Sequence, residues 1–166
     1  MIFVTLGTQK QSFKRLLEEI DKCHILDNEE IVAQIGYTKY ESDRIKTFDF
    51  LEKEEFLKYM EKAEFVITHG GVGSIFDAIL KDKKVLAMPR LKKYSEHVDD
   101  HQIEIVKKLS EEGYIVYYNP DEYIDEEDPP DLENKINFLR TNIFQKYTEN
   151  TEYLVKLNRA IEELLL

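Results

Sequence analysis

Six short apolar runs alternate with amphipathic segments along most of the chain, and this alternation limits the folds that the sequence can adopt. Helical periodicity predicts helices between the runs, over about 11–22, 53–62, 73–81 and 99–111. The apolar runs predict strands at 2–7, 31–36, 45–50, 65–68, 85–88 and 114–118. Strands that alternate with helices form parallel sheets that are buried on both faces. We therefore expect an α/β fold with a Rossmann-like, doubly wound parallel sheet.

The last third of the chain has a different pattern. An acidic stretch at 121–131 predicts a solvated loop, and two helices are expected after it, over about 131–140 and 143–165. The second of these helices carries an apolar stripe, which either packs on the sheet of its own chain or forms a surface for a partner. The stripe comprises Tyr147, Tyr153, Leu154, Leu157, Ile161 and Leu164 or Leu165. With no internal repeat or linker, residues 1–166 are expected to form one domain.

Composition excludes several classes of partner. The chain has 166 residues, of which 42% are hydrophobic, so it can bury a sizeable core. Its net charge of −11 argues against nucleic acid or an anionic membrane, because phosphate contacts need clustered Lys and Arg. The lone Cys23 cannot form an internal disulfide, and Met1 leads into an apolar strand without a basic leader. No apolar run approaches the ~20 residues of a membrane helix, so we expect a cytoplasmic chain without a direct membrane span.

A glycine-rich turn follows the fourth predicted strand, in the stretch FVITHGGVGSIFDAI at 65–79. A strand–turn–helix of this kind presents free backbone N–H groups at the positive end of a helix dipole, where a phosphate or diphosphate binds well. Glycine permits close approach of the backbone and positive φ. Ser74 adds a hydroxyl donor or caps the helix, and the Asp77 carboxylate can accept from two ribose hydroxyls. The turn matches neither the dinucleotide GxGxxG pattern nor a Walker A loop.

A second polar stretch, YSEHVDDHQ at 94–102, follows the fifth predicted strand. Because the carboxyl ends of parallel strands share one edge of a sheet, this stretch and the glycine turn can face one crevice. A metal site would use His97, His101 and a carboxylate, but the helix is expected to start near Asp99, which leaves His97 outside it. A hydrogen-bonding pocket for a polyhydroxylated ligand fits His101 and Gln102 better. An ordinary polar helix start is the alternative without a ligand.

Together, THGGVGSIFDAI, VLAMPR and EHVDDHQIEIVKKL resemble the C-terminal, nucleotide-sugar-binding half of the GT-B glycosyltransferases of family 28. IFVTLGTQKQSFKRLLEEID and IVAQIGYTKY also fit, so the resemblance covers most of the chain. Within this family the chain is similar to the small single-domain subunits of split enzymes. These include the subunit of the N-glycan N-acetylglucosamine transferase and the PssE-type subunits of capsule and exopolysaccharide synthesis.

The resemblance implies a UDP-sugar donor, with no cofactor and no metal required. It places the diphosphate over the glycine turn and the ribose at Asp77, where the family more often has Glu. His101 and Gln102 match the pair that contacts the donor sugar, and His69 is implied at the phosphates or the acceptor side. The full set of implied binding residues is Gly7, Thr8, His69, Gly70, Gly71, Gly73, Ser74, Asp77, His101 and Gln102.

The acceptor-binding half of the two-domain enzymes is missing from this sequence. The resemblance therefore implies a membrane-anchored partner subunit and a polyprenyl-diphosphate-linked sugar acceptor, with this chain held at the inner face of the membrane through the partner. An inverting hexosyl transfer needs a general base, which is either His69 or a group on the partner. Basic residues at 81–84 and 90–93 face phosphate, the partner or solvent.

Two other functions are compatible with the sequence. One is a non-catalytic accessory subunit that stabilises or enhances a partner transferase, because a fold can lose its chemistry and keep its interface. The other is an unrelated nucleotide-binding α/β enzyme, such as an epimerase of the same GT-B ancestry.

Overall fold

The computed structural model describes residues 1–122 and 130–146. Its centre is a six-stranded sheet in the order β3-β2-β1-β4-β5-β6, and every neighbouring pair is parallel. The strands are β1 (Ile2–Thr5), β2 (Ile31–Gln34), β3 (Ile45–Phe48), β4 (Phe65–His69), β5 (Lys84–Met88) and β6 (Val116–Tyr117). All six predicted strands are present, each within a few residues of its predicted bounds. The expected doubly wound α/β fold is confirmed.

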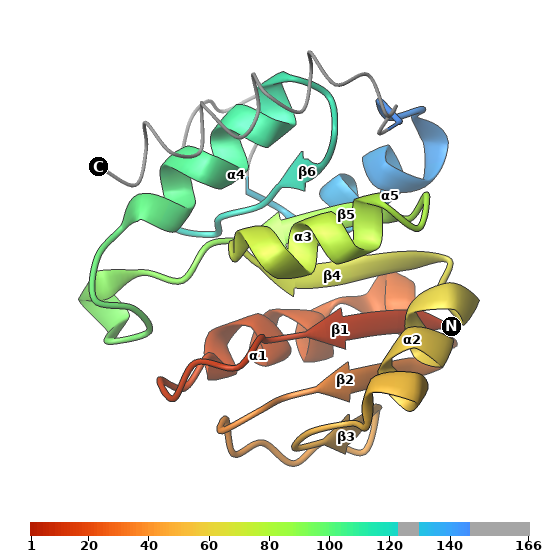
Figure 1. Cartoon of the computed structure of the whole chain (residues 1–166), viewed down its shortest axis with the longest axis vertical. Coiled ribbons are helices and arrows are strands. Elements are labelled where there is room, and N and C mark those ends of the chain that lie inside the picture. Colours follow the sequence, from red (N-terminus) through yellow and green to blue (C-terminus); the bar gives the residue numbers. More distant parts are fainter. Residues whose placement is uncertain (123–129, 147–166) are drawn as a thin grey trace.

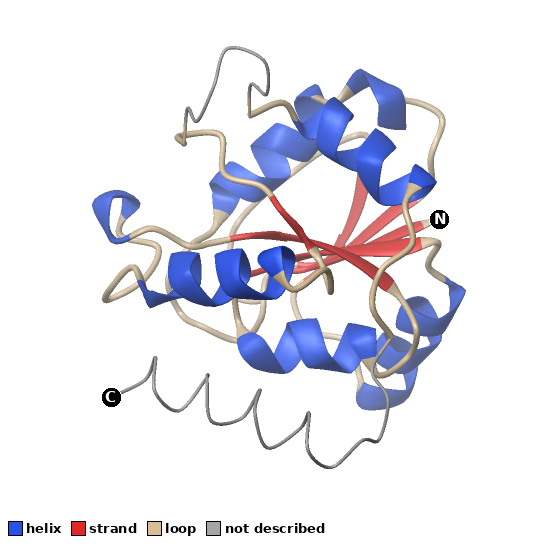
Figure 2. Cartoon of the chain, turned by 90° about the horizontal axis from the view of Figure 1, so that it is seen from above, coloured by secondary structure: helices blue, strands red, loops and turns tan. Residues whose placement is uncertain are grey.

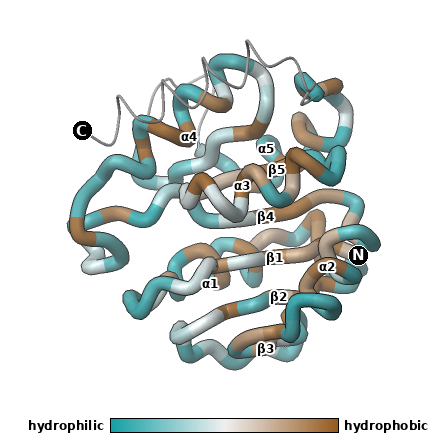
Figure 3. Tube along the Cα trace, in the orientation of Figure 1, coloured by the Kyte–Doolittle hydropathy of each residue, from teal (hydrophilic) through white to brown (hydrophobic). Residues whose placement is uncertain are grey.

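Helices cover both faces of the sheet (Figures 1 and 2). The α-helices are α1 (Lys14–Lys22), α2 (Lys53–Lys62), α3 (Val72–Ile79), α4 (His101–Glu111) and α5 (Leu132–Thr141). Two 3-10 turns, η1 (His24–Leu26) and η2 (Lys92–Tyr94), were not expected from the sequence. Hydrophobic and hydrophilic residues alternate along α2 and α4 (Figure 3), as expected for helices with one buried side.

The core is divided by the sheet into two clusters. Leu16, Leu17 and Ile20 of α1 pack with Ile136 and Leu139 of α5 on one face. On the other face, α2, α3 and α4 cover the sheet, and Phe3 packs against the rings of Phe56 and Tyr59. The residues of β1, β2 and β4 are buried on both sides of the sheet, which explains the continuous apolar runs of these strands.

Two helix starts differ from the expectation. Helix α1 begins at Lys14 rather than near residue 11, because the backbone N–H of Phe13 donates to the Thr38 hydroxyl at 3.0 Å, and Gln11 O accepts from Arg90. Residues 143–146, the start of the last predicted helix, are not helical, and 147–165 lie outside the described residues. Among the residues that the structure describes, no helix is long and apolar enough to cross a membrane.

The strand order fixes where a ligand can bind. The chain moves outward from β1 through β2 to β3, then returns to β4 on the other side of β1. The topological switch point therefore lies between β1 and β4, and in such sheets ligands bind at the carboxyl ends of the strands at this point. The loop that begins at Gly7 and the turn at 70–73 are the two connections that flank it.

Candidate functional site

The glycine turn leads directly into α3 and leaves its first amides unpaired. Gly71 is the N-cap residue, and the helix has no side-chain cap. Of the two roles considered for Ser74, capping is therefore wrong, and that of a hydroxyl donor to a ligand stays a prediction. The first amide paired within the helix is that of Ile75, which donates to Gly71 O at 3.2 Å. In the described part of the chain, the N–H groups of Val72, Gly73 and Ser74 have no hydrogen-bond acceptor. Three donors therefore point out of the positive end of the helix.

Two of the three glycines of the turn, Gly70 and Gly71, are required by close neighbours. A Cβ on Gly70 would lie 2.8 Å from Gln102 Cβ, and a Cβ on Gly71 would overlap the His69 ring. A Cβ on Gly73 would meet no atom within 4 Å, so the space over this residue is open. The turn glycines do not have positive φ, contrary to the expectation; among the site glycines only Gly7 does, with φ of 73°. Close approach, and not a left-handed backbone, explains the turn.

His69 ends β4 and joins the two loops of the switch point. Its side chain is buried, and a Cβ on Gly7 would lie only 2.5 Å from its Cε1, so the ring fits between Gly7 and Gly71. The Thr68 hydroxyl donates to Thr5 O at 3.1 Å and lies 3.3 Å from His69 Nδ1. Since that hydroxyl has only one proton to donate, it accepts from the imidazole, which places the ring proton on Nδ1.

The imidazole of His69 is neutral at physiological pH. Burial, together with the nearby positive charge of Arg90, lowers its pKa to about 4. Nε2 is therefore unprotonated and can accept a hydrogen bond, although a group with so low a pKa is a weak base.

Gln102 connects the glycine turn to the loop after β5. Its Oε1 accepts from the backbone N–H of Gly70 at 3.1 Å and from that of Arg90 at 3.0 Å. Both acceptor positions of the oxygen are thus used within the protein, and only the NH₂ group is left for a ligand. The sequence predicted Gln102 in the site but did not indicate that its side chain joins the two loops by hydrogen bonds.

The remaining predicted residues, Thr8, Asp77 and His101, are exposed. Thr8 is exposed in the loop after β1, and Asp77 is exposed on α3. His101 opens α4 with Asp100 as its N-cap residue, and its Nε2 lies 4.0 Å from Asp99 Oδ2. Their contact with a ligand stays a prediction.

Arg90 and Lys93, in the loop after β5, have their hydrogen-bond or ion-pair partners within the chain. Arg90 was expected on the surface, but its side chain is only 1% exposed. Lys93 pairs with Asp121 at 2.8 Å. No group of three or more His, Cys, Asp or Glu side chains in the described ranges is arranged to hold a metal ion.

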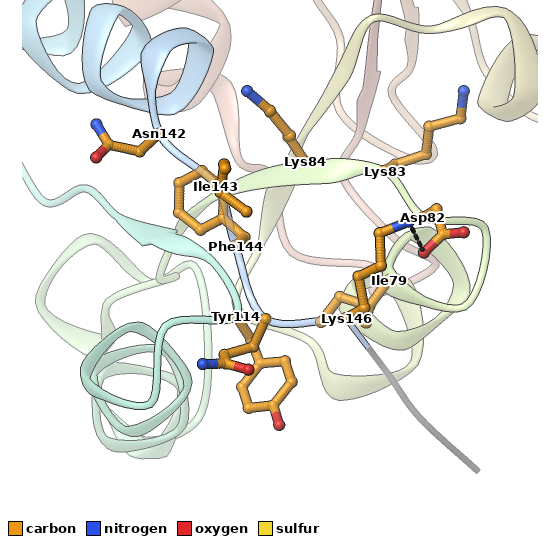
Figure 4. Close-up of a pocket in the computed structure, with 10 residues that line it drawn as sticks. Ile79, Asp82, Lys83, Lys84, Tyr114, Asn142, Ile143, Phe144 and Lys146 are labelled. Carbon is orange, nitrogen blue, oxygen red and sulfur yellow. Dashed lines mark ion pairs between the residues drawn. The ribbon is translucent and has the colours of Figure 1, made fainter.

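A pocket of about 180 Å³ lies at the opposite edge of the sheet, where Lys84 begins β5 (Figure 4). Ile143 and Phe144 line it, and Lys146 pairs with Asp82 at its rim at 3.5 Å. This pocket is small for a nucleotide-sized ligand, and it does not lie at the carboxyl edge where the switch point is. The carboxyl edge is therefore the candidate site.

A parallel doubly wound sheet with a free helix N-terminus at its switch point defines a protein of the Rossmann-like α/β class. Comparison with known proteins gives the family. Residues 1–164 match the model of the glycosyltransferase family 28 C-terminal domain, and the chain belongs to that family.

Two similar curated proteins are transferases. Human "UDP-N-acetylglucosamine transferase subunit ALG13" is 28% identical over 127 residues, covering 70% of this chain and 11% of that protein. The Clostridium botulinum UDP-N-acetylglucosamine–N-acetylmuramyl-(pentapeptide) pyrophosphoryl-undecaprenol N-acetylglucosamine transferase is 30% identical over 132 residues, covering 76% of this chain and 32% of that protein. This chain thus spans a third or less of the length of these two relatives.

Solved structures agree on the fold. The solution structure of ALG13 superposes with a TM-score of 0.62 at 19% identity and covers 94% of both chains. The kitacinnamycin glycosyltransferase has a TM-score of 0.59 at 17% identity, and the match covers 98% of this chain but 39% of that one. The fold is that of one half of a GT-B glycosyltransferase.

Proposed function

We propose that this chain is the donor-binding subunit of a two-component glycosyltransferase that moves a hexose from a UDP-sugar to a polyprenyl-diphosphate-linked acceptor. The observation that carries the proposal is the group of three unpaired amides at Val72, Gly73 and Ser74, with open space over Gly73, at the switch point of the sheet. These donors match the charge and size of a diphosphate. Two relatives named as N-acetylglucosamine transferases support a nucleotide-sugar donor.

The other site residues take roles around the diphosphate. The carboxylate of Asp77 binds the ribose hydroxyls, and the NH₂ of Gln102 donates to the sugar or the phosphates. The acceptor hydroxyl attacks the anomeric carbon with inversion, and UDP leaves with its negative charge stabilised by the α3 amides. No metal is needed for this stabilisation.

The general base is either His69 or a group on the partner. The low pKa and the burial of His69 favour the partner as the source of the base. The acceptor site is proposed to lie on a partner, which the printed name of the relative ALG13, a transferase subunit, supports. We place the complex in exopolysaccharide or capsule synthesis, at the inner face of the membrane.

Calorimetric titration of the chain with UDP and a panel of UDP-sugars tests the proposal. Asp77→Ala should weaken UDP binding by roughly tenfold, the effect of losing a hydrogen-bonded contact. Glu111→Ala, which removes an exposed carboxylate from the far end of α4, is the matched control and should bind as the wild type does. If the wild-type chain does not bind UDP, alone or with its partner, the chain is instead the non-catalytic accessory subunit.

A further inference from the structure

Arg90 is a buried cation without a carboxylate partner of its own. Its guanidinium donates to three backbone carbonyl oxygens, those of Gln11 and Leu6 at 2.7 Å and that of Glu96 at 3.2 Å. The carboxylate of Glu96 is used elsewhere, because it receives two hydrogen bonds from Arg15, at 2.8 and 3.0 Å. The buried Arg90 and the partly buried Arg15 thus share the one carboxylate of Glu96, which leaves these three groups with a net positive charge.

This charge lies beside the candidate site. Leu6 and Gln11 flank the loop after β1, and the backbone N–H of Arg90 shares the oxygen of Gln102 with Gly70. The positive charge of Arg90 also acts on His69 at the end of β4, where it helps to lower the pKa of the imidazole. Arg90 itself stays charged at neutral pH: burial lowers its pKa, but only to about 10.

We propose that Arg90 supplies a fixed positive charge that attracts an anionic ligand to the glycine turn without contacting it. The proposal rests on the function proposed above, in which the ligand is a diphosphate. The chain as a whole carries a charge of −11 and repels anions, so a local source of positive potential is needed. A buried charge is screened by salt far less than a surface lysine, and the three carbonyl contacts hold it in place.

The alternative is that Arg90 only ties the loops together. Three variants of the full chain separate the two roles. Arg90→Lys keeps the positive charge but loses the guanidinium hydrogen bonds to the three carbonyl oxygens. Arg90→Gln keeps a hydrogen-bond donor but loses the charge. Glu96→Gln keeps an acceptor oxygen for Arg15 but removes the negative charge of Glu96, which makes the group of Arg15, Arg90 and residue 96 more positive.

The measurement is the affinity for UDP and for uridine by calorimetry, with circular dichroism to show that each variant is folded. We expect Arg90→Gln to weaken UDP binding by roughly tenfold and to leave uridine binding unchanged, since losing one unit charge beside the site affects a diphosphate at this scale but not a neutral nucleoside. Arg90→Lys should stay within about threefold of the wild type, and Glu96→Gln should bind UDP more tightly.

Equal losses in Arg90→Lys and Arg90→Gln, or a loss in Glu96→Gln, would show a purely structural role and overturn the inference. Wild-type affinity in Arg90→Gln would overturn it as well. If Arg90→Gln does not fold, Glu96→Gln still distinguishes the two roles. An electrostatic role predicts tighter UDP binding by this variant, and a purely structural role predicts weaker binding. A wild-type chain that binds no UDP would overturn the donor site itself, and this inference with it.

Discussion

The side-chain oxygen of Gln102 accepts a hydrogen bond of 3.1 Å from the backbone N–H of Gly70, and this contact joins α4 to the glycine turn. The same oxygen accepts from Arg90 N, so one buried side chain sets the distance between the loops after β4 and β5. The amides of the turn are therefore held in position by a residue 32 positions further along the chain.

Gln102→Leu should destabilise the protein, because it leaves two buried N–H groups without an acceptor. We expect the free energy of unfolding in urea to fall by about 2 to 4 kcal/mol. Gln102→Glu restores an acceptor oxygen and should recover most of the stability, but its negative charge should abolish UDP binding. A Gln102→Leu variant as stable as the wild type would show that the two hydrogen bonds of Gln102 do not stabilise the protein.

Two glycine substitutions in the turn should have opposite effects on stability. Gly71→Ala drives a methyl group into the His69 ring and should cost about 1 to 3 kcal/mol. Gly73→Ala meets only open space and should stabilise α3 by up to about 1 kcal/mol. Because that space is where the diphosphate is proposed to lie, Gly73→Ala should also weaken UDP binding by roughly tenfold. Thermal melts and calorimetry on the two variants check both effects, and unchanged UDP affinity in Gly73→Ala would place the ligand elsewhere.

The buried ion pair between Arg15 and Glu96 should matter far more than an exposed pair on the same helix. Glu96→Gln leaves the partly buried guanidinium of Arg15 without its counter-charge and should cost about 3 kcal/mol. Glu18→Gln breaks the exposed pair with Lys14 and should change stability by at most about 0.5 kcal/mol. Urea unfolding of both variants gives the comparison, and similar small losses would mean that the pair contributes little.

The low pKa of His69 predicts a pH dependence of stability. Between its unfolded value of 6.5 and its folded value of about 4, the unfolded chain binds the proton and the folded chain does not. Stability should therefore be fully present above pH 6.5 and fall as the pH drops towards 4, by roughly 3 kcal/mol from this group. Imidazole resonances in a pH titration by NMR report the group directly. A His69 resonance that titrates near pH 6.5 would contradict the buried, neutral ring.

Local patterns were sufficient for much of the fold. The apolar runs at Phe65–His69 and Lys84–Met88 are buried on both faces of a parallel sheet, and such runs are readable from the sequence. The bounds of α2 were predicted to the residue, since its apolar side and acidic first turn are local features. The glycine turn was found because it directly follows a strand and opens a helix.

The rest depended on contacts between distant residues. The sequence placed Arg90 with surface lysines, yet its guanidinium binds carbonyls 79 and 84 positions away. The late start of α1 follows from Thr38, which lies 25 positions from Phe13. Position 71 requires glycine because the His69 ring lies where a Cβ would be, and not because of the backbone angles of Gly71. Such long-range contacts leave no periodic signal in the sequence.

The most direct test of the donor site is a titration of the ¹⁵N-labelled chain with UDP, followed by the backbone amide resonances. The account predicts that the largest shifts occur at Val72, Gly73 and Ser74, whose N–H groups are unpaired in the free protein. Smaller shifts should follow at Gly7 and at the NH₂ group of Gln102. Shifts confined to Asn142–Lys146, around the pocket at the opposite edge of the sheet, or no shifts at saturating UDP, would contradict the account.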